Sequence, residues 1–269
     1  MYPFVKENLE IKRELGRGGT AAVYLAWDKW AKKQVAIKAL FKTRYEDRMI
    51  REKFKQEANL YLYLEHPNIA DLTDYIVTPE TDYIVMEYIQ GINLEEYIQT
   101  KSGPIADENL FKIFTQILHG VAYAHHQKVT HLDIKPSNIM VTNDLIVKIL
   151  DFGISSSKDE KIENAKRRMG TPMYMSPEQI DMKNVGRQSD IYSLGVTLHH
   201  MVTGQLPYKG GSIKEIFHKI KNEKLPKIRD IYPHANIKLQ PIIDAATEKN
   251  LQKRYKTCEE FEYFLSQAV

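Results

Sequence analysis

The sequence predicts an α+β fold with two segregated parts: a small antiparallel sheet carrying one helix, followed by a larger, mainly helical part. Short apolar runs broken by glycine or charged turns, typical of strands, fill most of the first 87 residues. Helical periodicity dominates after Gly91. Because the two patterns do not alternate, a parallel sheet built from strand–helix–strand units is excluded.

The composition is that of an ordinary globular protein, with 269 residues, 43% hydrophobic and 27% charged. A chain of this length buries roughly 70–75% of its unfolded surface, so it needs no disulfide or metal to fold. Cys258 is its one cysteine, which fits a reducing compartment. The first residues lack the apolar segment of a signal peptide, and we interpret the uncharged run 191–208 as a buried helix. These features predict a cytoplasmic protein with no membrane insertion in this chain.

The charges are unevenly distributed, although the net charge is only +3. Residues 29–55 hold ten Lys/Arg and three Asp/Glu, whereas residues 56–100 hold nine Asp/Glu and no Lys/Arg. A basic block of this kind can contact nucleic acid, but no aromatic residues interleave with it as a base-stacking platform. We therefore interpret the block as a solvated face and expect no nucleic-acid partner.

The elements follow in a simple order. Strands are expected at 9–16, 22–28, 34–40, 70–77, 83–87 and 145–150. Between the third and fourth lies a helix whose face is formed by Ile50, Phe54, Glu57, Tyr61 and Leu64, and His66-Pro67 should end it. A later helix is expected to start at Asp107, which is its predicted N-cap. Further helices are expected at 189–203, 212–222, 238–249 and 257–267. The predicted domains are an N-lobe at 1–87, a hinge at 88–93 and a C-lobe at 94–269.

Two motifs lie in the strand-rich part. The glycines of Gly16-Arg17-Gly18-Gly19 stand between two strands, where backbone N–H groups could close over phosphates; a plain hairpin turn is the alternative. This placement argues against a dinucleotide fold, whose glycine motif opens a helix. Lys38 ends the apolar run Val35-Ala36-Ile37 and needs a partner unless it lies at the surface. Glu57, in the middle of the apolar helix face, is the candidate partner.

The third motif is His131-Leu132-Asp133-Ile134-Lys135-Pro136-Ser137-Asn138, and Asp151-Phe152-Gly153 follows the strand after it. Phosphoryl transfer needs a proton acceptor for the hydroxyl, oxygen ligands for Mg²⁺ and cations for the moving phosphate. Asp133, Lys135, Asn138 and Asp151 supply these groups at compatible spacings.

With these motifs in this order, the chain resembles the eukaryotic-like Ser/Thr protein kinases from about Leu9 to Leu265. Segment 170–178 is similar to the substrate-binding and APE region of that family, and 190–195 to its central C-lobe helix. Arg254 stands where the family pairs an arginine with the APE glutamate, here Glu178. The resemblance implies a bilobal kinase fold that transfers the ATP γ-phosphate to Ser or Thr of a protein substrate.

The resemblance also implies a role for each matching residue. Lys38, paired with Glu57, would hold the α- and β-phosphates, Asp133 would accept the hydroxyl proton, and Lys135 would steady the γ-phosphate. Asn138 and Asp151 would hold Mg²⁺, for which Mn²⁺ could substitute. The nucleotide would lie among Leu15, Gly16, Gly18, Val23, Ala36, Lys38, Met86, Glu87, Ile89, Asn93 and Met140. His131 would pack under Phe152 rather than act in catalysis. A regulatory partner or additional domains are left open.

Three departures from the family pattern stand out. Ala21 replaces the third glycine of the loop, and Ser176 replaces the alanine of APE, a change expected to be harmless. Leu132 replaces the arginine of HRD, a non-RD feature, and no Ser, Thr or Tyr lies between Ser157 and Thr171. Since that arginine pairs with an activation-segment phosphate where it is kept, we hypothesise that such phosphorylation does not control this protein.

Two alternatives belong to other function classes. One is a pseudokinase that acts as an ATP-binding scaffold, but such proteins usually lose the equivalents of Lys38, Asp133 or Asp151, and all three are present. The other is a small-molecule kinase of similar fold, which would lack the segment from Thr171 to Glu178.

Overall fold

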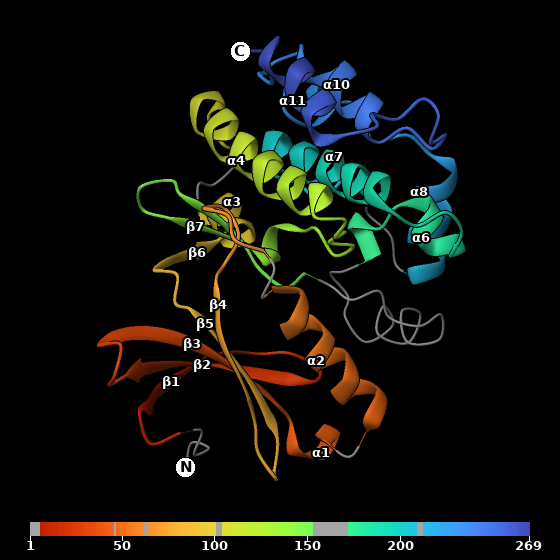
Figure 1. Ribbon diagram of the computed structural model, residues 1–269. Coiled ribbons are helices and arrows are strands. Elements are labelled where there is room, and N and C mark those ends of the chain that lie inside the picture. Colours follow the sequence, from red (N-terminus) through yellow and green to blue (C-terminus); the bar gives the residue numbers. More distant parts are fainter. Residues whose placement is uncertain (1–5, 46, 62–63, 101–103, 153–171, 209–211) are drawn as a thin grey trace. The chain divides into compact units, whose positions relative to one another are not determined.

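The computed structural model describes residues 6–45, 47–61, 64–100, 104–152, 172–208 and 212–269. Internal contacts divide the chain into two compact units, Met1–Gln90 and Gly91–Val269. The division falls within the segment 88–93, whose role as a hinge stays a prediction. Figure 1 labels the elements of both units.

The first unit is built on a five-stranded antiparallel sheet of order β1-β2-β3-β5-β4. Its strands are β1 (Leu9–Arg17), β2 (Ala21–Asp28), β3 (Lys33–Leu40), β4 (Leu72–Val77) and β5 (Asp82–Glu87). A short helix α1 (Lys42–Tyr45) precedes the main helix α2 (Arg48–Tyr61). The sequence prediction of an antiparallel sheet with one substantial helix is confirmed, and α1 is an addition to it.

Helix α2 packs its apolar face on the sheet. Phe54 and Ala58 are buried there with Leu40 of β3 and Ile84 of β5. The prediction that Leu64 continues the helical stripe was wrong, because α2 ends at Tyr61 and the buried Leu64 lies outside it. The proline that follows His66 disfavours helical backbone, and this segment forms a turn instead.

The second unit combines a three-stranded sheet of order β6-β7-β8 with helices. Its elements as far as Ile149 are β6 (Gly91–Asn93), α3 (Leu94–Thr100), α4 (Asp107–His126), the 3-10 turn η1 (Pro136–Asn138), β7 (Ile139–Thr142) and β8 (Val147–Ile149). They are followed by η2 (Pro172–Tyr174), α6 (Pro177–Asp181), α7 (Arg187–Thr203), α8 (Ile213–Asn222), α9 (Ile228–Ile231), α10 (Leu239–Ala246) and α11 (Cys258–Ser266).

Helix α7 is the core of the second unit. All its residues from Ser189 to Thr203 are buried, and α4, α9 and α10 pack against it (Figure 1). A helix without an exposed face is an interior helix, which confirms the interpretation of the uncharged run. Among the described residues, no helix has the length and apolar character needed to cross a membrane.

Two helix ends differ from the sequence prediction. Asp107 was expected as the N-cap of α4, but Ala106 holds that position, and no side chain in the described part of the chain caps the helix. Asp107 is instead the first helical residue, where an acid still interacts favourably with the helix dipole. Helix α10 ends at Ala246 rather than 249, and Thr247 Oγ1 donates to the Ile243 carbonyl there.

The crossing of α7 and α10 predicts the effect of a methyl group at Gly195. A Cβ there would lie 2.7 Å from Thr247 Cγ2 and 2.8 Å from Ala246 Cβ. We expect Gly195→Ala to lower the free energy of unfolding by about 1–3 kcal/mol through overpacking, although alanine is the better helix former. Urea denaturation measures the change. Gly16→Ala is the control, since no atom of the described residues lies within 4 Å of its Cβ position. A more stable Gly195→Ala protein would contradict the packing argument.

Candidate active site

The catalytic motif places two side chains, those of Lys135 and Asn138, against the carboxylate of Asp133. Asp133 Oδ2 accepts hydrogen bonds from Lys135 Nζ at 2.7 Å and from Asn138 Nδ2 at 3.0 Å. Asn138 Nδ2 also donates to the Asp133 carbonyl at 2.9 Å. The Asp133 side chain is 33% exposed and that of Lys135 only 11%. One oxygen of Asp133 is therefore held from within while the group remains accessible from solvent.

A buried carboxylate on α7 fixes the backbone of this loop. Asp190 is fully buried, and it accepts hydrogen bonds from the backbone N–H groups of His131 at 2.8 Å and Leu132 at 2.7 Å. His125 Nε2 donates to the same carboxylate at 2.8 Å, since a carboxylate can only accept. These bonds satisfy the buried charge of Asp190 and fix the backbone of the two residues before Asp133.

His131 is a packing residue, as predicted. Its ring lies 4.6 Å from that of Phe152, centroid to centroid. Nε2 donates to the Leu150 carbonyl at 2.9 Å and Nδ1 accepts from Asp133 N–H at 3.2 Å, an arrangement that fits the neutral imidazole. Burial lowers its pKa, against the opposing charge of Asp190, so His131 stays neutral near pH 7.

The residues expected to hold Mg²⁺ lie on adjoining segments. Leu150 N–H donates to the Asn138 carbonyl at 2.8 Å, which brings Asp151, next in the chain, beside Asn138. Because the Asn138 amide nitrogen faces Asp133, its oxygen is the atom available to a cation. An amide oxygen and a carboxylate are hard ligands that suit Mg²⁺ together with phosphate oxygens and water. Among the described residues, no group of three or more His, Cys, Asp and Glu forms a metal site by itself.

The first unit carries the other motifs. Gly18 N–H donates to the Ala21 carbonyl at 2.8 Å, closing the turn between β1 and β2. Ala21 is buried in the core cluster against α2, so its methyl group is accommodated where the family has glycine. Lys38 lies in β3, and Glu57 lies in α2. The Glu57 side chain is outside the described part of the chain, so the Lys38–Glu57 pair stays a prediction.

The residues expected around the nucleotide fall in both units. Leu15, Gly16, Val23, Ala36, Met86 and Glu87 lie on strands of the first unit, Gly18 lies in a turn, and Ile89 follows β5. In the second unit, Asn93 of β6 and Met140 of β7 are neighbours in the sheet. Asn93 Oδ1 accepts from Glu96 N–H at 2.8 Å and so caps α3, a structural role that the sequence analysis did not assign. The joint role of these residues in nucleotide binding stays a prediction.

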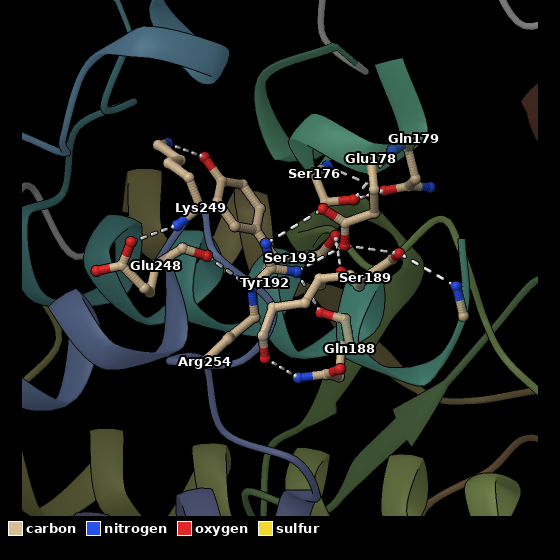
Figure 2. A network of polar contacts seen from close by, with 12 residues as sticks. Ser176, Glu178, Gln179, Gln188, Ser189, Tyr192, Ser193, Glu248, Lys249 and Arg254 are labelled. Carbon is tan, nitrogen blue, oxygen red and sulfur yellow. Dashed lines mark hydrogen bonds and ion pairs between the residues drawn. The ribbon is translucent and has the colours of Figure 1, made fainter. Parts of the chain in front are cut away.

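A buried ion pair joins α6 to the segment before α11 (Figure 2). Arg254 Nη1 lies 2.6 Å from Glu178 Oε1, and Nη2 lies 3.1 Å from Oε2, which confirms the pairing predicted from the sequence. Ser189 Oγ donates to Glu178 Oε1 at 2.9 Å. Burial by itself raises the pKa of Glu178, but the hydrogen bonds and charge of Arg254 lower it below its ordinary value.

Two residues near Glu178 have roles that the sequence analysis missed. Ser176 is the N-cap of α6 and forms a capping box with Gln179. Gln179 Nε2 also donates to the Leu132 carbonyl at 2.9 Å. The pattern Ser-x-x-Gln is a known signal of a helix start and could have identified the cap. The bond to Leu132 has no comparable local signal.

Comparison with known proteins agrees with these observations. The protein kinase domain family model matches residues 9–267. The chain is 35% identical to the probable serine/threonine-protein kinase PknB of Lactococcus lactis, over 94% of this chain and 41% of that protein. It is 36% identical to the serine/threonine-protein kinase PrkC of Bacillus subtilis, over 94% of this chain and 39% of that protein. The chain therefore spans about two-fifths of the length of these relatives.

Among solved structures, the crystal structure of the Mycobacterium tuberculosis PknI kinase domain superimposes with a TM-score of 0.78. The two chains are 23% identical, and the match covers 98% of this chain and 97% of the other. At this identity the similarity establishes the fold, and it confirms the predicted class: an antiparallel sheet with one main helix followed by a helical part.

The Glu178–Arg254 pair predicts how stability depends on pH. Because the folded-state pKa of Glu178 lies below its ordinary value of 4.5, the ionised pair stabilises the fold fully above that pH. The stabilisation is lost as the pH falls through the lowered folded-state pKa. We expect Glu178→Gln to lower the free energy of unfolding by about 3–5 kcal/mol at pH 7, because Arg254 is left buried without its counter-charge.

Urea denaturation between pH 3 and pH 7 measures this difference, which should shrink toward the acidic end. Glu10→Gln is the control, since Glu10 and Lys12 form an ion pair with both side chains about half exposed. A difference for Glu178→Gln that stays constant with pH would show that the charge of Glu178 is not what stabilises the fold.

Proposed function

This chain belongs to the protein kinase domain family and is of the serine/threonine type, and on that premise we propose how its residues carry the reaction. We propose that it transfers the γ-phosphate of ATP to Ser and Thr hydroxyls of proteins without needing a phosphate on its own activation segment. The single observation that carries the proposed transfer is the accessible Asp133 carboxylate, with one oxygen held by Lys135 and Asn138.

Asp133 is the proton acceptor in this mechanism. Its Oδ2 is engaged by the Lys135 ammonium and the Asn138 amide. We therefore assign Oδ1 to the substrate hydroxyl. Its proton passes to Oδ1 as the hydroxyl oxygen bonds to the γ-phosphorus, while the bond from that phosphorus to the β–γ bridging oxygen breaks and ADP leaves. The two donors hold the carboxylate in one orientation, so the hydroxyl oxygen is directed along the line of attack.

Lys135, Asn138 and Asp151 serve the phosphates. Lys135 Nζ, already next to Asp133, supplies positive charge where the transferred phosphoryl group passes. Asn138 through its amide oxygen and Asp151 through its carboxylate would hold Mg²⁺, which when bound neutralises charge on the β- and γ-phosphates. The first unit contributes Lys38 for the α- and β-phosphates, with Glu57 as its partner, and the backbone around Gly16 and Gly18.

The scaffold alternative finds no support. A pseudokinase that binds ATP without transfer usually lacks one of Lys38, Asp133 and Asp151, and the chain keeps all three. The relatives that align over 94% of the chain are named as serine/threonine-protein kinases. The substrate protein, a regulatory partner and a cytoplasmic location stay predictions.

Control without activation-segment phosphorylation rests on two features of the chain. Leu132, which replaces the arginine of HRD, has no group that could pair with a phosphate. Residues 158–170 contain no Ser, Thr or Tyr. This stretch, together with Ser155, Ser156, Ser157 and Thr171, lies outside the described residues.

The catalytic assignment predicts the effect of Asp133→Asn. An amide cannot accept the hydroxyl proton as a carboxylate does, so kcat should fall on the order of 10²–10⁴-fold. Phosphate transfer from labelled ATP with Mg²⁺ to a generic protein acceptor measures it. Asp144→Asn, in the exposed turn before β8, is the matched control and should keep the wild-type rate. An Asp133→Asn enzyme with a near wild-type rate would remove Asp133 from its role.

The hypothesis that activation-segment phosphorylation does not control this protein predicts the behaviour of phosphatase-treated enzyme. Once mass spectrometry shows that it carries no phosphate on residues 153–171, this enzyme should transfer phosphate at the untreated rate from the first turnover. A lag that ends only when a phosphate appears on this segment would contradict it.

A further inference from the structure

The side-chain amide of Gln179 joins α6 to the catalytic loop. Gln179 is 4% exposed, and its Nε2 donates to the Leu132 carbonyl at 2.9 Å. Its Oε1 accepts from Ser176 N–H at 3.0 Å and from Ser176 Oγ at 3.2 Å (Figure 2 shows Ser176 and Gln179). The amide orientation is determined, because a backbone N–H can only donate and a carbonyl can only accept.

The carbonyl that Gln179 holds belongs to the peptide directly before Asp133. Leu132 has a φ of 59°, in the left-handed region that is unfavourable for a residue with a branched side chain. Such a conformation persists only where the surroundings impose it. Here Asp190 holds the Leu132 N–H at 2.7 Å and Gln179 holds its carbonyl at 2.9 Å, so both polar groups of the strained residue are fixed.

The two contacts differ in what they hold. Asp190 fixes the N-terminal side of Leu132. The following peptide is held at both of its polar groups: its N–H, that of Asp133, donates to His131 Nδ1 at 3.2 Å, and its carbonyl accepts from Gln179 Nε2 at 2.9 Å. The bond from Gln179 is the shorter of the two and comes from outside the loop, and rotation of the peptide about ψ of Leu132 would turn the carbonyl away from Nε2. The same rotation would displace the Asp133 backbone and the carboxylate that Lys135 and Asn138 hold.

We propose that Gln179 is a positioning residue that holds Asp133 in its productive orientation, in place of an anchor that depends on phosphate. The proposal rests on the proposed function, because it concerns the orientation of the catalytic carboxylate. The chain lacks an arginine at position 132 that a phosphate could engage. The bond from Gln179 instead joins two uncharged groups that neither phosphorylation nor pH changes, and its other end is secured by the capping box of α6.

The test compares Gln179→Met with Gln188→Met. Methionine fills a similar volume but donates no hydrogen bond. Gln188 makes the same kind of contact, with Nε2 donating to the carbonyls of Leu251 at 2.8 Å and Tyr255 at 3.1 Å. Neither of these acceptors belongs to the catalytic loop 131–138. For Gln179→Met we expect kcat to fall on the order of 10–100-fold with KM for ATP unchanged, as for a displaced catalytic group. For Gln188→Met we expect the wild-type kcat.

Gln179→Glu supplies a readout that a purely structural role would not move. A carboxyl group buried at this position has a raised pKa, and in its neutral form it can donate to the Leu132 carbonyl as the amide does. Once ionised, it only accepts and repels that carbonyl. The kcat of Gln179→Glu relative to wild type should therefore be highest at low pH and decline as the pH rises, whereas the Gln179→Met ratio stays constant.

Hydrogen exchange at the backbone amide of Asp133, which belongs to the peptide whose carbonyl Gln179 holds, tests this positioning without activity. Faster exchange in Gln179→Met but not in Gln188→Met supports it. Wild-type exchange and kcat in Gln179→Met would overturn the proposal, as would equal loss in both methionine variants. If the wild-type protein transferred no phosphate, the proposed function would fail, while the exchange result would still decide whether Gln179 holds the loop.

Discussion

The buried carboxylate of Asp190 is the constraint on which the rest of the second unit depends. It stands in a helix whose residues from Ser189 to Thr203 are all buried, so its charge must be satisfied by donors that come to it. Two of the donors are consecutive backbone N–H groups, of His131 and Leu132, and the third is His125 of α4. The conformation of the catalytic loop is therefore a consequence of solvating one charge inside an apolar core.

A second buried charge orders the other side of the site. Glu178 pairs with Arg254, and Ser189, the residue before Asp190, donates to it. Gln179, next to Glu178, extends this network to the Leu132 carbonyl. The short helix α6 is thus bound both to the segment before α11 and to the loop that carries Asp133. Ion pairs of this kind seldom add much net stability, but loss of one partner is severe, so they favour a single arrangement.

Much of the fold could be predicted because it follows from local patterns. The strands of the first unit and helices α7, α8 and α11 were predicted to within about two residues, since alternation and helical periodicity operate over short distances. The errors concern the ends of helices. Asp107 was taken for a cap that Ala106 provides, and Leu64 was placed on a helix that ends at Tyr61. Neither the last turn of a helix nor its cap is determined by periodicity alone.

The sequence by itself determined the chemistry of the site. Asp133, Lys135 and Asn138 lie within six residues, so their spacing in a single loop already places a proton acceptor, a cation and an oxygen ligand together. Only the tertiary structure decided how that loop is oriented. The groups that hold it, Asp190 and Gln179, are 58 and 47 residues from Leu132. No local pattern specifies which distant donor or acceptor will satisfy a given backbone group, because that pairing arises only when α6 and α7 pack beside the loop.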